Sequence, residues 1–117
     1  MKLEVQILQD IIDYCDEIES DLEYFGDDVE AVVDNKRFQR SVEFCLFQIG
    51  EKVKSLRSKF GSRYMTDYWK KIAGMRDVIG HGYDSFDHES VWPIVKDGIP
   101  ELRDICRKTI EDLDGND

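Results

Sequence analysis

Apolar residues recur at intervals of three or four along two long runs, and this spacing is the feature that most constrains the fold. The first run covers residues 2–25 and the second covers residues 36–60. Such spacing gathers the apolar side chains on one side of a helix. In the second run Phe44 and Phe47 widen the apolar surface beyond one stripe. We therefore expect the second helix to touch two neighbours, or a second subunit.

Helix start and stop signals divide the rest of the chain. Asp34 or Asn35 is suited to cap the second helix, and Gly61-Ser62 follows its end. Thr66 is suited to cap a third helix that runs to about Gly80. A short helical turn is expected at residues 29–33.

The last part of the sequence predicts two helical segments, residues 88–97 and 100–113, separated by Gly98. No segment shows the alternation typical of strands. The sequence therefore predicts an all-α fold, an up-and-down four-helix bundle with a kinked or broken last helix. Residues 1–113 would form a single domain, followed by a frayed tail at residues 114–117.

Charge is unevenly distributed along the 117 residues, which carry a net charge of −10. Residues 35–83 hold 11 basic and 4 acidic side chains, whereas both flanking thirds are acidic. This argues against nucleic-acid binding through the whole surface, although a basic stripe could still hold a short phosphate backbone. The alternative is a set of solvated, lysine-rich helix faces. The sequence shows neither a membrane span nor a signal peptide, so we expect a cytoplasmic protein.

Three widely spaced cysteines, Cys15, Cys45 and Cys106, each fall at or beside an apolar helical position. We expect reduced thiols inside the core of a cytosolic protein. The sequence has no Cys-x-x-Cys, His-Glu-x-x-His or Glu-x-x-His motif. A structural zinc or di-iron site is therefore not expected, and no cofactor is predicted.

The residues most suggestive of chemistry stand together at 75–83, the stretch Met-Arg-Asp-Val-Ile-Gly-His-Gly-Tyr. On a straight helix Arg76 and His81, five positions apart, would point about 140° away from each other. Glycines on both sides of the histidine weaken the helix there, which would let His81 turn back toward Arg76. Arg76 also falls on the same arc as Trp69 and Ile72, where a permanent charge needs a carboxylate, a phosphate or a polar cleft.

Arginine, four residues, then His-x-Tyr resembles the motif of HEPN domains, most closely that of the HepT toxins of HepT/MNT toxin–antitoxin systems. Residues 49–51, 69–76, 91–92 and 100–102 fall in the order typical of that group, so that the resemblance covers about residues 1–113. Two positions depart from it. Asp77 stands where asparagine is common, and a proline before Trp92 is missing.

The resemblance implies a metal-independent endoribonuclease that drives the 2′-hydroxyl of RNA onto the adjacent phosphorus. His81 would then be the general acid or base and Arg76 the clamp on the phosphate oxygens, with Asp77 orienting one of them. One histidine and one arginine are few groups for a site that needs both a general acid and a general base. A homodimer, which the resemblance also implies, would supply two of each across a shared cleft.

The same resemblance implies a partner, a nucleotidyltransferase antitoxin of the MNT type. This enzyme would attach AMP to the motif tyrosine, Tyr83, and silence the toxin. The added negative charge and bulk at the mouth of the cleft would repel RNA phosphates.

Other interpretations of these residues remain open. The chain could be a non-catalytic helical HEPN scaffold that docks a nucleotidyltransferase, whereas a nucleotide-binding regulatory domain lacks a phosphate loop to support it. Arg76 could be a structural ion-pair partner of Asp77 or Glu51. His88 is expected to sit at a helix N-terminus without taking part in chemistry. Trp69 and Trp92 are expected in the core.

Overall fold

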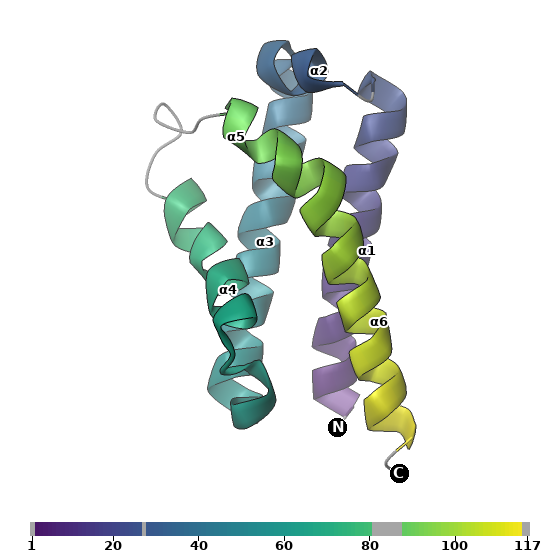
Figure 1. Cartoon of the computed structure of the whole chain (residues 1–117), viewed down its shortest axis with the longest axis vertical. Coiled ribbons are helices and arrows are strands. Elements are labelled where there is room, and N and C mark those ends of the chain that lie inside the picture. Colours follow the sequence, from purple (N-terminus) through teal and green to yellow (C-terminus); the bar gives the residue numbers. More distant parts are fainter. Residues whose placement is uncertain (1, 27, 81–87, 116–117) are drawn as a thin grey trace.

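The apolar runs form long helices in a computed structural model that describes residues 2–26, 28–80 and 88–115 (Figure 1). At residues 31–33, 76–80 and 88–90 only the backbone is described. Four long helical stretches run alternately up and down, and both chain ends lie at the same end of the bundle. The elements are α1 (Lys2–Phe25), α2 (Val29–Asp34), α3 (Lys36–Phe60), the 3-10 helix η1 (Gly61–Tyr64), α4 (Asp67–Gly80), α5 (His88–Pro93), the π-helix η2 (Ile94–Gly98) and α6 (Ile99–Gly115).

The helix ends follow from local chemistry. The Asn35 side chain accepts a hydrogen bond from the backbone N–H of Phe38 at 3.1 Å, so Asn35 is the N-cap of α3. Gly61 ends α3 with a φ of +69°, a conformation that glycine adopts without the Cβ clash of other residues. The Thr66 hydroxyl lies 3.4 Å from the backbone nitrogen of Trp69, at the start of α4.

Helix α3 packs against α1 on one side and against α4 on the other, and α6 packs along α1. The prediction that the second helix touches two neighbours is thus confirmed. Each of the packed faces buries its apolar stripe completely or nearly so, because an exposed apolar stripe would forfeit the hydrophobic stabilisation. Among the described residues, no helix combines the length and the apolarity that crossing a membrane requires.

The predicted break in the last helix is also confirmed. Between α5 and α6 the backbone widens into η2, where the Ile99 N–H donates to the carbonyl of Ile94, five residues earlier. Pro100 then falls in the first turn of α6, and because it has no N–H it donates no hydrogen bond back into η2. Through this wide turn the chain remains helical while changing direction slightly, as the bend between α5 and α6 shows (Figure 1).

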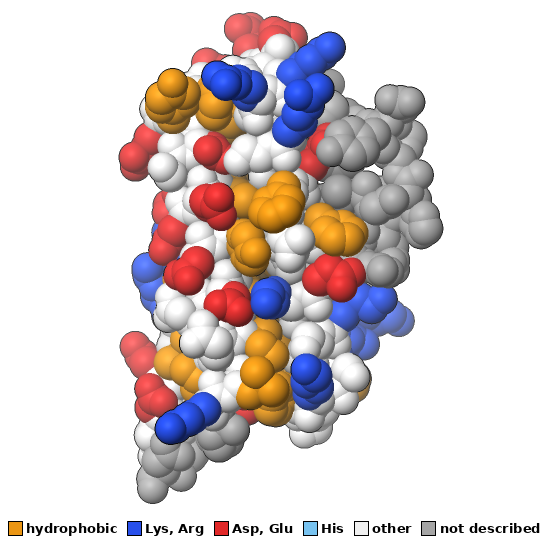
Figure 2. Space-filling view, turned by 180° about the vertical axis from the view of Figure 1, so that it is seen from behind, with side chains coloured by type: hydrophobic (Ala, Val, Ile, Leu, Met, Phe, Trp, Pro, Cys, Tyr) orange, Lys and Arg blue, Asp and Glu red, His pale blue; other side chains and the backbone are white. Residues whose placement is uncertain are grey.

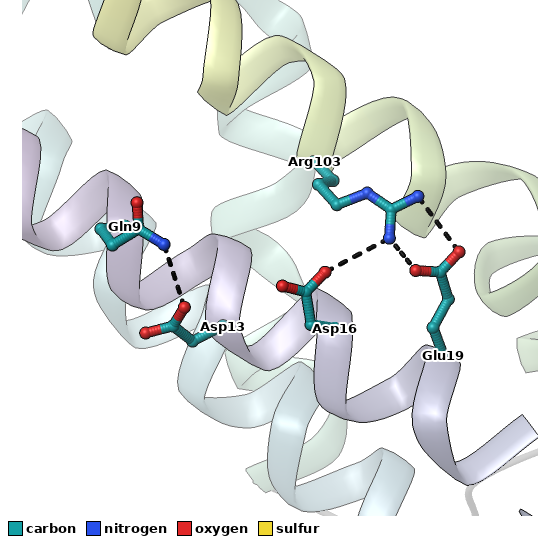
Figure 3. Close-up of polar contacts among 5 residues, drawn as sticks. All are labelled: Gln9, Asp13, Asp16, Glu19 and Arg103. Carbon is teal, nitrogen blue, oxygen red and sulfur yellow. Dashed lines mark hydrogen bonds and ion pairs between the residues drawn. The ribbon is translucent and has the colours of Figure 1, made fainter.

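An ion cluster joins α6 to α1 (Figure 3). The Arg103 guanidinium contacts Asp16 at 3.3 Å and Glu19 through both terminal nitrogens, with one of these bonds at 3.1 Å. The Arg103 side chain is only 15% exposed, whereas the two carboxylates are more open to solvent. A forked contact of this kind fixes the angular register of α6 on α1, and solvent around the carboxylates limits its contribution to stability.

Aromatic rings fill the end of the bundle where α3 turns into α4. Tyr64 is fully buried, and its hydroxyl donates to Glu4 of α1 at 2.6 Å. Its ring meets Trp69 edge-on at 5.3 Å, and Trp69 meets Tyr68 in the same way at 5.5 Å. Burial, with the Glu4 bond adding to it, raises the pKa of Tyr64, so the hydroxyl keeps its proton and remains a donor. The cluster therefore fixes the N-terminal end of α4.

The three cysteines are free thiols buried in the core, as predicted. Burial raises the pKa of Cys15 and of Cys45 to about 12. Because the thiolate is the reactive form, these thiols are chemically quiet at neutral pH.

Tyr64→Phe tests the buried hydrogen bond. The substitution leaves the Glu4 carboxyl, which is 6% exposed, without its donor, and we expect the free energy of unfolding to fall by about 1.5–3 kcal/mol. Urea unfolding at pH 7 measures the change. Tyr24→Phe is the matched control, since Tyr24 is 80% exposed, and it should change stability by less than about 0.5 kcal/mol. Equal effects of the two substitutions would contradict a role for the Tyr64–Glu4 bond.

Candidate functional site

Helix α4 carries the first half of the predicted motif toward its C-terminal end. Arg76 and Asp77 lie on α4, which ends at Gly80, as the sequence predicts. The side chains of both residues are outside the described part of the structure, and His81 and Tyr83 lie outside the described residues altogether. The assignment of Arg76, Asp77, His81 and Tyr83 as site residues therefore stays a prediction.

The backbone of α4 is positioned by its packing on α3. Trp69 is 5% exposed and Ala73 is 8% exposed, so this face of α4 is buried. Ala73 follows Trp69 by four residues and Arg76 follows Ala73 by three, which places position 76 next along the same side of the helix. Ile72 and Met75 are partly buried against the core beside that face. The register of α4 thus places backbone position 76 at the end of a buried stripe.

A basic groove runs between α3 and α4. Its lining consists of Lys54 and Arg57 from α3 and Lys70, Ala73 and Gly74 from α4, around a volume of about 240 Å³. The sequence predicted a basic middle third but not that these three cations line one groove. The sequence indicated each wall of the groove separately. Lys54 and Arg57 are three residues apart and therefore share one side of α3. Lys70 shares one side of α4 with the small residues Ala73 and Gly74.

A larger groove lies between α1 and α3 on the opposite side of α3. It has a volume of about 610 Å³, with Leu3 and Ile7 on one wall and Phe47 and Gln48 on the other. Phe44, next to this groove on α3, is 55% exposed and meets Tyr14 edge-on at 6.2 Å. Figure 2 shows apolar side chains running down this face, flanked by acidic ones. We call this surface, defined by Leu3, Tyr14, Phe44 and Phe47, the α1–α3 outer face.

The sequence also predicts positions in the fold for the two tryptophans and for His88. Trp69 is in the core, as predicted, whereas Trp92 packs against the core only in part, with the Lys96 ammonium 5.7 Å from its ring centre. That contact is a cation–π interaction on a half-exposed ring. His88 is the first residue of α5. Within the part of the chain that the structure describes, no three His, Cys, Asp or Glu side chains gather as metal ligands would.

Comparison with known proteins gives the family. A family model described as ribonuclease HepT-like matches residues 8–109. The chain is 35% identical to "Putative RNase MJ1216" of Methanocaldococcus jannaschii, over 94% of this chain and 89% of that protein. It is 36% identical to "Putative RNase MJ0125" of the same organism, over 92% of this chain and 90% of that protein.

A further relative carries the family name itself. "Probable ribonuclease HepT" of Thermococcus cleftensis is 33% identical over 59% of this chain and 63% of that protein. No solved structure matches this chain. The family model spans most of α1, all of α3 and α4 and most of α6, and the matched region includes the whole Arg-x4-His-x-Tyr motif. The chain belongs to the ribonuclease HepT-like family.

Proposed function

We propose that this protein is the toxin of a HepT/MNT-type toxin–antitoxin system and cleaves RNA in the cytoplasm without a metal ion. The observation that carries the proposal is the family match over residues 8–109, which contains Arg76, His81 and Tyr83 at the motif spacing. The register of α4, which continues its buried face to the position of Arg76, supports it.

The proposed reaction is an internal displacement at phosphorus. The 2′-oxygen forms a bond to the adjacent phosphorus while the bond from phosphorus to the 5′-oxygen breaks. One imidazole takes the proton from the 2′-hydroxyl and a second proton is delivered to the leaving 5′-oxygen. The products are a 2′,3′-cyclic phosphate and a 5′-hydroxyl end. Negative charge grows on the non-bridging oxygens, where the Arg76 guanidinium can donate two parallel hydrogen bonds.

Asp77 has two possible effects in this scheme. As a hydrogen-bond acceptor it can orient Arg76 or His81, which is the role we propose. A carboxylate beside a phosphate clamp also repels the phosphate, so it weakens the clamp unless it is itself paired. Asp77→Asn distinguishes the two effects, because the amide keeps a polar group and removes the charge.

The scheme calls for two copies of the chain. A single histidine cannot be base and acid at once, whereas a two-fold dimer with the 76–83 segments facing one another supplies an imidazole for each role. The α1–α3 outer face is a candidate for the contact between copies. Its exposed Phe44 and Leu3, 55% and 52% exposed, are apolar groups that association would remove from water.

The proposed regulator is a nucleotidyltransferase antitoxin of the MNT type. It would transfer AMP to the hydroxyl of Tyr83, with pyrophosphate leaving from ATP. The new phosphodiester brings a negative charge two residues from His81, where it would repel the RNA backbone.

The first prediction concerns cleavage. Wild-type protein in excess EDTA should cut RNA and leave 2′,3′-cyclic phosphate ends, and His81→Ala should lower kcat/KM by about 10²-fold or more. Arg76→Lys, which keeps the charge and loses the fork, should also be impaired. Gel assays with end-group analysis measure both. If homogeneous wild type whose intact mass shows no AMP does not cut RNA, the non-catalytic scaffold is the correct function.

The second prediction concerns the tyrosine. Cells that co-express the antitoxin and Tyr83→Phe should stop growing, because the acceptor hydroxyl is missing, whereas wild type should be neutralised and gain the mass of one AMP. His81→Ala with Tyr83 intact is the control for modification without toxicity. Complete neutralisation of the Tyr83→Phe variant would show that silencing does not need this hydroxyl.

The third prediction concerns assembly. Sedimentation equilibrium should give a dimer for wild type, and Phe44→Glu should weaken the dimer by bringing a charge into an apolar contact. Lys108→Glu on the exposed side of α6 is the control, and it should remain dimeric. A wild-type monomer at assay concentration would rule out the composite site. A fully dimeric Phe44→Glu protein would rule out the α1–α3 outer face as the contact.

A further inference from the structure

We propose that the groove between α3 and α4, lined by Lys54, Arg57 and Lys70, binds the phosphodiester backbone of RNA as it approaches the motif. The inference rests on the proposed function for the identity of its ligand, and it concerns a surface separate from the predicted catalytic residues.

The pairing of basic residues differs between the two sides of α3. Lys52, which faces α1, pairs with Asp10 at 3.2 Å. Arg103 on α6 is held by two carboxylates of α1. Among the described residues, by contrast, no carboxylate lies within ion-pair distance of Lys54 or Lys70, and the groove lining contains no acidic side chain. In a chain with 26 acidic and 16 basic residues, three cations around one groove whose described lining holds no acid mark a site for an external anion.

Arg57 gives the groove a fixed donor. Its Nη1 donates to the backbone carbonyl of Tyr64 at 3.2 Å, and Arg57 is only half-exposed. That bond uses one of the five N–H donors of a guanidinium and holds the group in place without neutralising its charge. A positioned guanidinium is suited to phosphate oxygens, and the flexible Lys54 and Lys70 can adjust around the same backbone.

The α4 wall leaves room for a ligand. Ala73 and Gly74 follow Lys70 by three and four residues, so they lie on the same side of the helix. A Cβ atom built on Gly74 would meet no atom within 4 Å. A polynucleotide backbone can therefore approach the helix closely at this point, directly above the lysine.

The course of α4 connects the groove with the motif. Gly74 precedes Arg76 by two residues, and Ala73 precedes it by one helical turn. From Lys70 to the helix end at Gly80 the axis covers about 15 Å. An RNA strand that follows α4 from the groove thus reaches the motif within a few nucleotides. In Figure 2 basic side chains gather at the right-hand edge, the side of the molecule on which α4 lies.

The experiment measures binding without cleavage. A fluorescent single-stranded RNA with 2′-O-methyl groups keeps the phosphates and lacks the attacking hydroxyl, so wild-type protein can be used. Fluorescence anisotropy between 50 and 300 mM salt should show that Lys54→Gln/Lys70→Gln weakens binding about tenfold or more at 0.1 M salt. The slope of log K against log salt should become shallower by about 1.4, or ~0.7 for each lost cation. Arg57 is left in place because its bond to Tyr64 also supports the turn after α3.

The matched control is Lys2→Gln/Lys108→Gln. It removes the same charge from two exposed lysines that do not line the groove, and its affinity should fall by less than threefold. Equal losses in both double variants would mean that only the net charge matters, which overturns the site. Wild type that ignores this RNA at 50 mM salt, or that binds vesicles with anionic lipid instead, also overturns it.

Cleavage of unmodified RNA separates this inference from the proposed function. If wild type cuts RNA while Lys54→Gln/Lys70→Gln binds and cuts as well as the control, the groove is not a backbone site and the nuclease stands. If the groove variants lose binding although wild type cuts nothing, the groove binds RNA and the nuclease proposal falls. With both correct, the groove variants should raise KM and leave kcat nearly unchanged.

Discussion

The burial of two faces of α3 is the constraint on which the rest of the structure depends. One face packs on α1 and the other on α4, and the residues between them, including Val42, Cys45, Leu46 and Ile49, are at most 1% exposed. A helix with a single stripe would hold α1 or α4, but not both. Loosening the core of α3 would therefore act on the motif-bearing helix directly. Large-to-small substitutions there cost about 2–5 kcal/mol, a large part of the stability of a domain of this size.

This packing separates basic side chains that pair with carboxylates of α1 from those that line the α3–α4 groove. The acidic faces of α1 neutralise bases that lie against them, as in the pairs Lys52–Asp10 and Arg103–Asp16. Beside the bases on the far side of α3, the described lining that α4 contributes consists of Lys70, Ala73 and Gly74 and includes no carboxylate. The molecule as a whole repels a polyanion, whereas the α3–α4 groove attracts it over a distance of about one Debye length, ~8–10 Å in ordinary buffers. RNA affinity should therefore depend on local contact with the groove and not on long-range steering.

Sequence periodicity predicted the helices well because each boundary is marked by a local signal. Asn35 caps α3, Gly61 ends it, and the break near Gly98 appears as η2. Contacts between segments far apart in the chain carried no comparable signal. Tyr64 lies in a stretch without apolar periodicity, and its partner Glu4 is 60 residues away, so nothing local marked the pair as buried. The basic groove was likewise hidden, since Lys54 and Lys70 come together only when α3 and α4 pack. The catalytic assignment of Arg76, Asp77, His81 and Tyr83 rests on motif spacing and remains a prediction.

The regular helical geometry of α4 links the contacts at its start to the position of its end. A helix transmits position faithfully: each added residue moves every later side chain by about 1.5 Å and turns it by about 100°. The Tyr64–Trp69–Tyr68 cluster fixes the beginning of α4, and the buried Trp69 and Ala73 fix its rotation on α3. The position of the C-terminal end of α4 at Gly80 is therefore set by contacts about 15 Å away. Aromatic packing at one end of the bundle thus determines where the α4 backbone at positions 76 and 77 lies relative to the basic groove, although none of these rings belongs to the predicted site.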